Sequence, residues 1–441
     1  MKMKKILLSL SLLLAGYAAN AQSWTPQASG FSEASRGISE FSIVDANIVW
    51  ALAYDGSASG TPDPQQFSKT TNGGTTWTPG SIDLGDPSLE INNIIAIDAD
   101  NAWVTALVPA DGNGVTFRTY DGGLNWIQQN PLGFQSTGES FLNGVHFFDE
   151  NNGVTYGDPA NGEFEIYTTT DGGDNWTLVP AANIPNPLNG EYGYNGGNQF
   201  IGNTCFLVTN KGRILKSTDM GMNWTAYQAP VTDFGSAAQS GRLAFSTASN
   251  GHMLKTVGTT YTYYTTSDGA QTWSAGTPFT GLYRVLTYVP GTSTIVATSA
   301  VQTAAGSAYS NDNGTTWTTI DSGEQRGIAA FYDGSTGWCA GFSQDASTGG
   351  VFKFSGSLSN SQFTSTKFSV YPNPSNSNVT ISSPEVDSYK LRVMDITGKV
   401  VINKDLNGLE NSIDVSNFSN GLYFFEINAA NAAQTIKIIK N

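Results

Sequence analysis

Short runs of alternating apolar and polar residues dominate the chain between residues 40 and 355. Stretches such as NIVWALAY, NAWVTALV and FEIYTTT have the period of two that is typical of strands, and Gly, Asn and Asp residues separate them. Among these strands an eight-residue phrase recurs six times, first as TTNGGTTW at 70–77. Each phrase closes with a tryptophan, at Trp77, Trp126, Trp176, Trp224, Trp273 and Trp317. Spacings of 49, 50, 48, 49 and 44 residues leave room for about four short strands per period, which predicts the blades of a β-propeller.

The two ends of this region predict one further blade. Residues 326–354 repeat the first three strands of a blade but stop without the phrase, and SWTPQ at 23–27 matches TWTPG at 76–80, which follows the first phrase. We therefore predict an all-β chain with seven four-stranded blades, in which the N-terminal strand closes the last blade. Such closure leaves no open sheet edge around the ring.

The phrase reads Ser/Thr-x-Asp/Asn-x-Gly-x-Thr/Asn-Trp, which predicts a hairpin turn between the third and fourth strands of a blade. Its acidic or amide side chain accepts backbone N–H bonds within the turn, and its Gly permits a positive φ. Its Trp re-enters the blade as a large packing element. The fifth copy has Ala270 in place of Gly, so we expect that turn to be the least regular. The side chains that we expect to organise the turns are those of Asn72, Asp121, Asp171, Asp219, Asp268 and Asp312.

This phrase resembles the Asp-box, or BNR repeat, of sialidases, sortilin-type receptors, some polysaccharide hydrolases and a family of photosystem II assembly factors. The resemblance covers about residues 40 to 320. It implies a propeller fold, and it implies little about chemistry because propellers carry many unrelated activities. We therefore interpret the phrase as scaffold.

A different pattern follows the polar segment GSLSNSQFTST at 356–366. YPNP at 371–374, DITGK at 395–399 and SNGLYF at 419–424 resemble the type A C-terminal sorting domain of the type IX (Por) secretion system of Bacteroidetes. The resemblance implies a small β-sandwich over 367–441 that the type IX secretion machinery reads as an address and often removes. The alternative is an adhesive sandwich that stays attached to the propeller.

The N-terminus has the features of a secretory signal peptide. A basic start precedes an apolar run from Ile6 to Ala15, and the small residues Ala19, Asn20 and Ala21 follow. The run is too short to span a bilayer. We expect a signal peptide at 1–21, a propeller at 22–355, a linker at 356–366 and the sorting domain at 367–441. This order implies passage through the periplasm and the outer membrane to the cell surface or the medium.

Charge and the remaining residue types restrict the partners. The formal net charge of −15 repels phosphate backbones and anionic lipid, so we expect neither nucleic acid binding nor membrane insertion. His146 and His252 lie in apolar strands without metal-ligand spacing, so we expect packed side chains, no metal and no cofactor. Cys205 and Cys339 fall in second strands on opposite sides of the ring, which predicts free, buried thiols. We expect a monomer.

A binding site is expected on the face opposite the phrases, where the innermost strands begin and where sialidases, by resemblance, hold their active site. Four arginines lie at or just before these strand starts: Arg36, Arg242, Arg284 and Arg326. Carboxyl and tyrosine side chains occupy nearby positions: Glu139, Glu191 and Tyr192 first, with Glu90, Tyr283 and Glu324. The segment GEYGYNGGNQF at 190–200 adds a rim suited to carbohydrate or protein.

Two functions fit these residues. The first is a non-catalytic propeller that binds a glycan or a protein at this face. The second is a glycoside hydrolase of sialidase-like or polysaccharide-cleaving type, with arginines that clamp a carboxylate. The Phe/Tyr-Arg-Ile-Pro signature of sialidases is absent, and the ring has seven predicted blades rather than six. A structural alternative is that the arginines form salt bridges with the abundant acids. Converging arginines and two carboxylates roughly 5–10 Å apart would favour the hydrolase.

Overall fold

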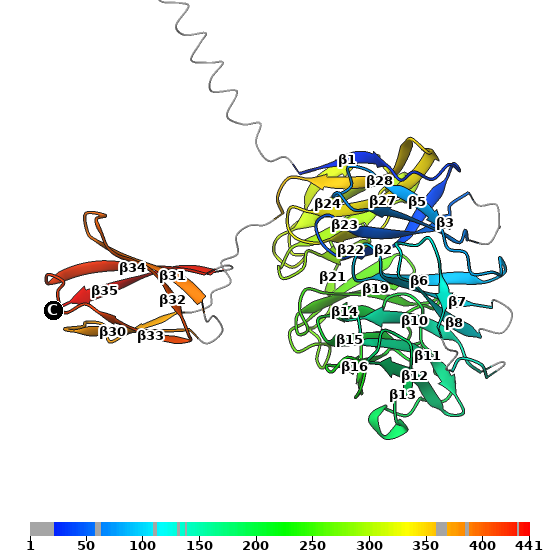
Figure 1. Cartoon of the computed structure of the whole chain (residues 1–441), viewed down its shortest axis with the longest axis horizontal. Helices are drawn as coiled ribbons and strands as arrows, with labels where there is room; N and C mark the ends of the chain where they lie inside the picture. Colours follow the sequence, from blue (N-terminus) through cyan, green and yellow to red (C-terminus); the bar gives the residue numbers. More distant parts are fainter. Residues whose placement is uncertain are drawn as a thin grey trace, which may run out of the picture. The chain divides into compact units, whose positions relative to one another are not determined.

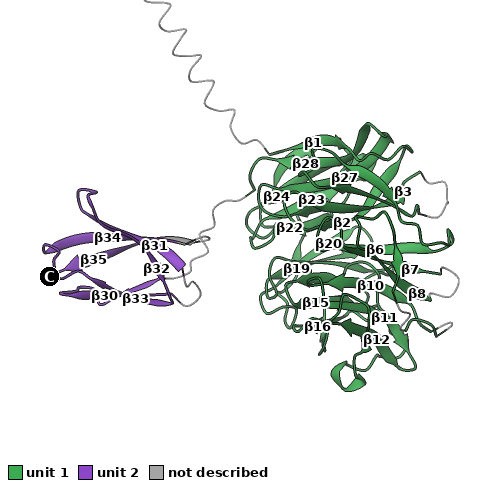
Figure 2. Cartoon of the chain, viewed as in Figure 1, with its two compact units in different colours: residues 1–359 green, residues 360–441 purple. Residues whose placement is uncertain are grey.

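The computed structural model describes residues 22–57, 63–108, 113–129, 133–136, 139–358, 368–383, 388–429 and 432–441. It divides into two units, residues 1–359 and 360–441, which are described separately (Figure 2). The predicted signal peptide and residues 359–366 of the predicted linker lie outside the described residues.

Seven four-stranded antiparallel sheets form the first unit, each a blade of a propeller (Figure 1). The first blade consists of β2 (Arg36–Ile43), β3 (Val49–Asp55), β4 (Gln66–Thr70) and β5 (Thr78–Ser81). The second and third blades are β6 (Glu90–Ala96), β7 (Ala102–Leu107), β8 (Gly114–Thr119) and β9 (Ile127–Gln128), then β10 (Leu142–Phe147), β11 (Gly153–Ala160), β12 (Glu163–Thr169) and β13 (Thr177–Leu178).

The next three blades repeat this order, with short 3-10 turns at Ala181–Asn183 and Gln302–Ala304. The fourth blade is β14 (Gln199–Ile201), β15 (Thr204–Val208), β16 (Arg213–Ser217) and β17 (Thr225–Gln228). The fifth is β18 (Ser240–Phe245), β19 (Gly251–Val257), β20 (Thr260–Thr266) and β21 (Thr277–Pro278). The sixth is β22 (Val285–Tyr288), β23 (Ile295–Ser299), β24 (Gly306–Ser310) and β25 (Thr318–Ser322).

The N-terminal strand completes the seventh blade. β1 (Ser23–Ala28) pairs antiparallel with β28 (Thr348–Ser355), which follows β26 (Ala329–Phe331) and β27 (Gly337–Asp345). Trp24 of β1 is buried against Phe331 and Phe354. β2 packs against β26 and β27, which closes the ring. The prediction of seven blades closed by the N-terminal strand is confirmed.

The six recurring phrases form one turn, repeated between the third and fourth strands; we call these segments the box turns (70–77, 119–126, 169–176, 217–224, 266–273 and 310–317). In the first, Asn72 Oδ1 accepts the N–H of Thr76 at 2.9 Å, and Thr70 Oγ1 accepts that of Gly74 at 2.8 Å. The Asp side chains of the other turns accept the equivalent N–H at 2.8 to 2.9 Å. Hydrogen bonds from Asn125 hold the pKa of Asp121 down to about 2. Each box turn therefore satisfies backbone N–H groups with its own side chains.

The expectation that Ala270 makes the fifth turn irregular is wrong. Ala270 adopts φ 71°, and its N–H reaches Thr266 Oγ1 at 3.1 Å, as the glycines do in the other turns. A Cβ at Gly123, the equivalent position in the second turn, would lie 2.4 Å from the Phe67 ring. The Ala270 methyl is instead accommodated, fully buried, in the core between the fourth and fifth blades. The fifth turn thus tolerates alanine because its neighbours leave space, at a backbone cost of roughly 1 kcal/mol.

Cationic side chains connect several blades through the box turns. In each case a Lys or Arg of the third strand donates a hydrogen bond to a backbone carbonyl in the next blade. The acceptor is the carbonyl of the residue that directly follows the box Asp or Asn. The four bonds are Lys69 to Gly122 (2.9 Å), Arg118 to Gly172 (2.9 Å), Lys216 to Gly269 (3.0 Å) and Lys353 to Gly73 (2.6 Å). The last of these joins the seventh blade to the first, so the box turns stabilise the ring as well as the blades.

The second unit is a β-sandwich of two sheets. One has the order β29 (Ser369–Tyr371), β30 (Asn378–Ser382) and β33 (Glu410–Asp414). The other has the order β32 (Val400–Asn407), β31 (Ser388–Asp395), β34 (Gly421–Ala429) and β35 (Ala432–Lys440). Val379, Leu391, Phe425 and Ile427 belong to its buried core.

Cys205 on β15 and Cys339 on β27 are free and buried, as predicted, and burial raises the pKa of both thiols. His252, on β19, is buried between the rings of Tyr263 and Tyr288. Within the described part of the chain, no helix is long and apolar enough to cross a membrane.

Candidate functional site

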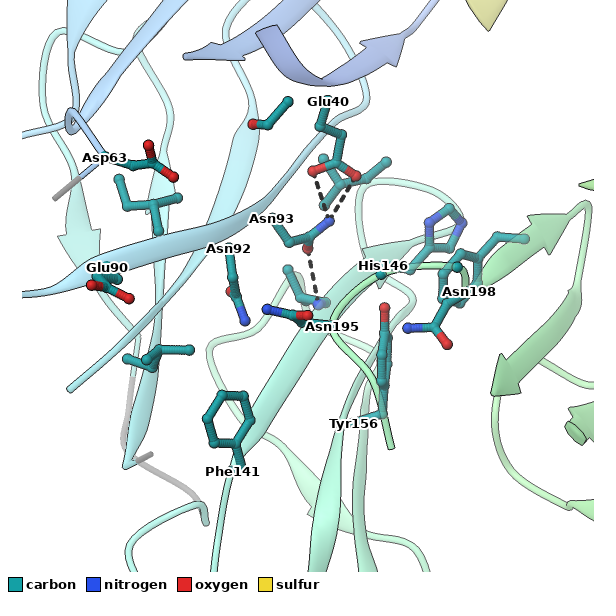
Figure 3. Close-up of a pocket in the computed structure, with 18 residues that line it drawn as sticks. Glu40, Asp63, Glu90, Asn92, Asn93, Phe141, His146, Tyr156, Asn195 and Asn198 are labelled. Atoms are coloured by element: carbon teal, nitrogen blue, oxygen red, sulfur yellow. Dashed lines mark hydrogen bonds between the residues drawn. The ribbon is translucent and has the colours of Figure 1, made fainter. Parts of the chain in front are cut away.

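A cavity of about 680 Å³ lies among the innermost strands of the first four blades (Figure 3). Its lining includes Glu90, which begins β6, Phe141, which precedes β10, and the segment 195–198, which precedes β14. First and third strands of a blade are parallel because each pairs antiparallel with the second. The starts of first strands therefore lie away from the box turns, which follow the ends of third strands. The cavity is on the predicted face.

The ring wall is open between the third and fourth blades, where β14 is short and packs weakly on β10. β14 has only three residues, and its packing against β10 is the weakest between neighbouring innermost strands of the ring. Residues 195–198 replace the missing strand, and Gly197 adopts φ 84°. On the facing strand, Gly144 has no side chain, and a Cβ there would lie 2.6 Å from the Tyr156 hydroxyl. Gly144 thus admits the hydroxyl of Tyr156, which lines the cavity, and the short strand leaves the wall open beside it.

Three strand bulges occur in this region, and two of them direct a polar side chain, that of Glu40 or Asn93, toward the cavity. The strand register shifts between Ile38 and Glu40 in β2, between Ile91 and Asn93 in β6, and between Leu142 and Gly144 in β10. A bulge adds one residue to a strand and redirects its side chains. Glu40, Asn93 and Gly144 consequently occupy equivalent positions in three successive blades.

Glu40 and Asn93 connect neighbouring blades in the same way. The Glu40 carboxylate accepts the N–H of Ile94 at 2.8 Å and the Asn93 amide at 3.0 Å. The Asn93 carbonyl oxygen in turn accepts the N–H of Val145 at 3.0 Å. Burial raises the pKa of Glu40 to about 7, although these hydrogen bonds oppose the shift. A titratable carboxyl thus stands where the next blade has a neutral amide.

Neutral rings form another part of the wall. His146 stacks on Phe200 with ring centres 4.1 Å apart and planes 6° from parallel. Burial lowers the pKa of His146 to about 3, so the imidazole is uncharged at neutral pH. Burial also raises the pKa of Tyr156, whose hydroxyl lies beside the Asn198 amide (Figure 3). The ring of Phe141 also lines the cavity (Figure 3).

The charged groups of the cavity are acidic. Glu40, Asp63 and Glu90 line it, and its described lining contains no Lys or Arg. Its remaining polar side chains are Ser39, the Tyr156 hydroxyl and the amides of Asn92, Asn93, Asn195 and Asn198. The site therefore offers amide donors and acceptors, carboxylate acceptors and flat rings.

The four predicted arginines lie apart from this cavity. Arg36 forms a 3.6 Å salt bridge with Asp55. Arg326 is buried over the Phe352 ring and donates from Nε to Asp321 at 2.8 Å. Arg284 lies over Tyr261, 4.1 Å from the ring centre, and Arg242 is exposed on β18. The structure does not bring the four together, and their role as ligand groups stays a prediction.

The other three predicted site residues also lie outside the cavity lining. Glu191 is buried and accepts hydrogen bonds from Arg213 Nε at 2.9 Å and from Thr209 at 2.7 Å. Tyr192 is exposed and meets Tyr194 edge to face. Glu139 accepts the N–H of Asn161 at 3.0 Å. Their role in ligand binding likewise stays a prediction.

Sequence reasoning found part of the cavity and missed the rest. Glu90 and the predicted rim segment at 190–200 contribute to it. Glu40, Asn93, His146 and Tyr156 were missed as site residues. Alignment of the repeats places Glu40 and Asn93 in one register, which is the signal that could have found them. Among the described residues, no group of three or more His, Cys, Asp or Glu side chains could hold a metal ion.

Comparisons with known proteins agree with the two units. Residues 369–441 match the family model described as a secretion system C-terminal sorting domain. Residues 107–273 match the model described as photosynthesis system II assembly factor YCF48. No curated protein matches the chain.

Several solved structures resemble the chain at low identity. YCF48 bound to D1 peptide has 16% identity and a TM-score of 0.48, covering 77% of this chain and 98% of its own. YCF48 from Cyanidioschyzon merolae has 17% identity and a TM-score of 0.48, covering 76% and 99%. The NanB sialidase from Streptococcus pneumoniae has 13% identity and a TM-score of 0.41, covering 75% and 71%. The chain joins a BNR-type β-propeller to a C-terminal sorting domain, which directs export by the type IX secretion system to the cell surface or the medium.

Proposed function

We propose that this protein is a non-catalytic carbohydrate-binding propeller that holds a short glycan in the cavity opposite the box turns. The observation that carries the proposal is the cavity lining, in which amides and carboxylates surround a space of about 680 Å³ beside flat neutral rings. Amides both donate to and accept from sugar hydroxyls, and rings cover the apolar face of a sugar.

The size of the site favours a glycan over a protein ligand. The cavity is concave and falls within the range of roughly 300–1,000 Å³ that small-molecule sites occupy. A stable protein interface needs roughly 800 Å² from each partner, most of it on flatter surface. We therefore favour a glycan, and the binding test must also be able to detect a protein ligand.

A glycoside hydrolase is the second candidate, because the cavity brings three carboxyl groups together. Glu40, with its pKa raised to about 7, has the protonation behaviour of a general acid, and Glu90 or Asp63 would serve as its partner. Binding is favoured because the Glu40 carboxylate already accepts hydrogen bonds from Ile94 and Asn93. Asn93 makes the equivalent bond to Val145 of the next blade, so this position connects blades.

Glycan-array binding and reducing-end release, measured on the same full chain, test the proposal. We expect binding to neutral oligosaccharides without cleavage, and at least about tenfold weaker binding for Asn195→Ala and Phe141→Ala. Leu124→Ala, in a box turn, is the control and should bind like the parent. Cleavage that Glu40→Gln abolishes would establish the hydrolase instead. If no array glycan binds and the chain instead captures a protein partner, the ligand is a protein and not a glycan.

The same proposal retains the predicted division of the chain. Residues 1–21 act as signal peptide, 22–355 as the binding propeller and 356–366 as linker. Residues 367–441 are the part that the type IX secretion machinery reads. The propeller acts as a monomer, with no cofactor.

A further inference from the structure

Three acids on the cavity side of the propeller are paired with arginines, whereas, within the described ranges, the acids that line the cavity are not. Asp55, Asp321 and Glu191 each have an arginine partner: Arg36, Arg326 and Arg213. Glu40 and Glu90, which line the cavity, have no cationic partner among the described residues. In the part of the chain that the structure describes, the acids inside the cavity therefore carry negative charge that no cation compensates.

Glu90 is the most available of these acids. No described side chain or backbone N–H donates a hydrogen bond to its carboxylate, whereas Glu40 already accepts bonds from Ile94 and Asn93. Glu90 is half-buried at the start of β6, and Figure 3 shows it together with Asp63 and Asn92 among the lining side chains. A carboxylate accepts hydrogen bonds only, so its natural partner is a group rich in donors.

We infer that the cavity selects a cationic carbohydrate, an amino sugar whose free ammonium group pairs with Glu90 while its ring lies against the neutral aromatic wall. This inference rests on the proposed glycan binding and specifies the ligand class. An ammonium carries three donors and no acceptor, which complements the open oxygens of Glu90. An anionic sugar such as a sialoside meets uncompensated negative charge, and the arginines that would clamp it are engaged elsewhere or lie outside the lining.

Two trisaccharides separate charge from shape. Trimers of β-1,4-linked glucosamine and of N-acetylglucosamine share one backbone and differ in the free amine. Calorimetry on the full chain at about pH 6 keeps the amines protonated. We expect the glucosamine trimer to bind at least about tenfold more tightly, and this preference to shrink as NaCl rises from about 0.05 to about 0.5 M. A sialylated trisaccharide should not bind measurably.

Two matched variants locate the effect. Glu90→Gln should weaken binding of the glucosamine trimer about tenfold and binding of the acetylated trimer by much less, since Gln keeps the shape and removes the charge. Glu150→Gln makes the same charge change in the exposed β10–β11 loop on the box-turn face and should alter neither.

The outcomes distinguish this inference from the proposed function. If the acetylated trimer binds as tightly as the free amine, the charge selection is wrong and glycan binding stands. If the amine preference is equal in Glu90→Gln and Glu150→Gln, general attraction to an acidic protein explains it and the assigned contact is wrong. If neither trimer nor any array glycan binds, the proposed function fails and this inference fails with it.

Discussion

The two faces of the propeller differ in how strictly they repeat. On the box-turn face, six turns make the same side-chain-to-backbone bond at 2.8 to 2.9 Å, and cations from neighbouring blades bind the same carbonyl in four of them. On the opposite face, equivalent positions hold Glu40, Asn93 and Gly144, and β14, beside the cavity, has only three residues. The repeated bonds of the box turns stabilise the fold, and the cavity lies where the blades differ from one another.

This difference suggests where function evolves in such a ring. A turn that satisfies its own backbone groups can be copied into every blade without reference to its neighbours. A cavity needs unlike residues to meet across blades, so it arises where the repeat changes. Substitutions on the box-turn face should therefore alter stability alone, whereas those on the opposite face should also alter local order, pH dependence or binding.

The largest expected effect is on the repeated face. Trp77 is buried, and its Nε1 donates to Gln27 of the closing strand at 3.0 Å. Trp77→Ala should lower the free energy of unfolding by about 3–5 kcal/mol, measured by urea denaturation, because it leaves a large cavity and frees Gln27. Leu124→Ala, in the exposed tip of the second box turn, should change it by less than about 0.5 kcal/mol. A loss below about 1 kcal/mol for Trp77→Ala would remove the stabilising role assigned to this face.

On the opposite face, the buried pair of Glu191 and Arg213 holds the segment that leads into the cavity. Glu191→Gln leaves Arg213 unpaired and should lower the free energy of unfolding by about 3 kcal/mol. Hydrogen exchange should accelerate in residues 188–198 and stay unchanged in the box turns. Glu139→Gln, whose carboxylate is exposed, is the control and should affect neither. Equal acceleration on both faces would contradict the separation proposed here.

Glu40 gives the cavity a distinctive pH dependence. Its folded pKa of about 7 lies above the ordinary 4.5, so its protonated form stabilises the fold and that contribution falls as pH rises from about 4.5 to 7. Glu40→Gln mimics the protonated form at every pH. The variant should match the parent near pH 4 and exceed its stability by roughly 3 kcal/mol above pH 7. Thermal unfolding across this range checks the expectation, and a difference independent of pH would refute it.

The smallest effect is expected at Ala270. Ala270→Gly relieves a positive φ but removes a buried methyl group, and these effects nearly cancel, so the free energy of unfolding should change by less than about 0.5 kcal/mol. Gly123→Ala places a Cβ against Phe67 at the equivalent position and should cost more than about 2 kcal/mol. Stabilisation above about 1 kcal/mol in Ala270→Gly would show that the fifth turn is strained.

Sequence reasoning was most successful where bonding is local. The box turns were predictable because Asp121 and its partners Thr119 and Asn125 lie within one phrase. It failed at Ala270 because the space around that methyl group comes from side chains of other strands. It directed attention to the arginines because their positions relative to strand starts were visible, whereas their partners, such as Asp55 for Arg36, are set by the fold.

The sequence by itself determined the number of blades, the closure by the N-terminal strand, the hairpin at each phrase and the sorting domain. These features depend on periodicity and on contacts within a few residues. Only the tertiary structure decided where the wall opens and which side chains line the cavity. Glu40 meets Ile94 and Asn93 meets Val145 across more than fifty residues of chain, and the strand bulges that direct them have no signature in one sequence.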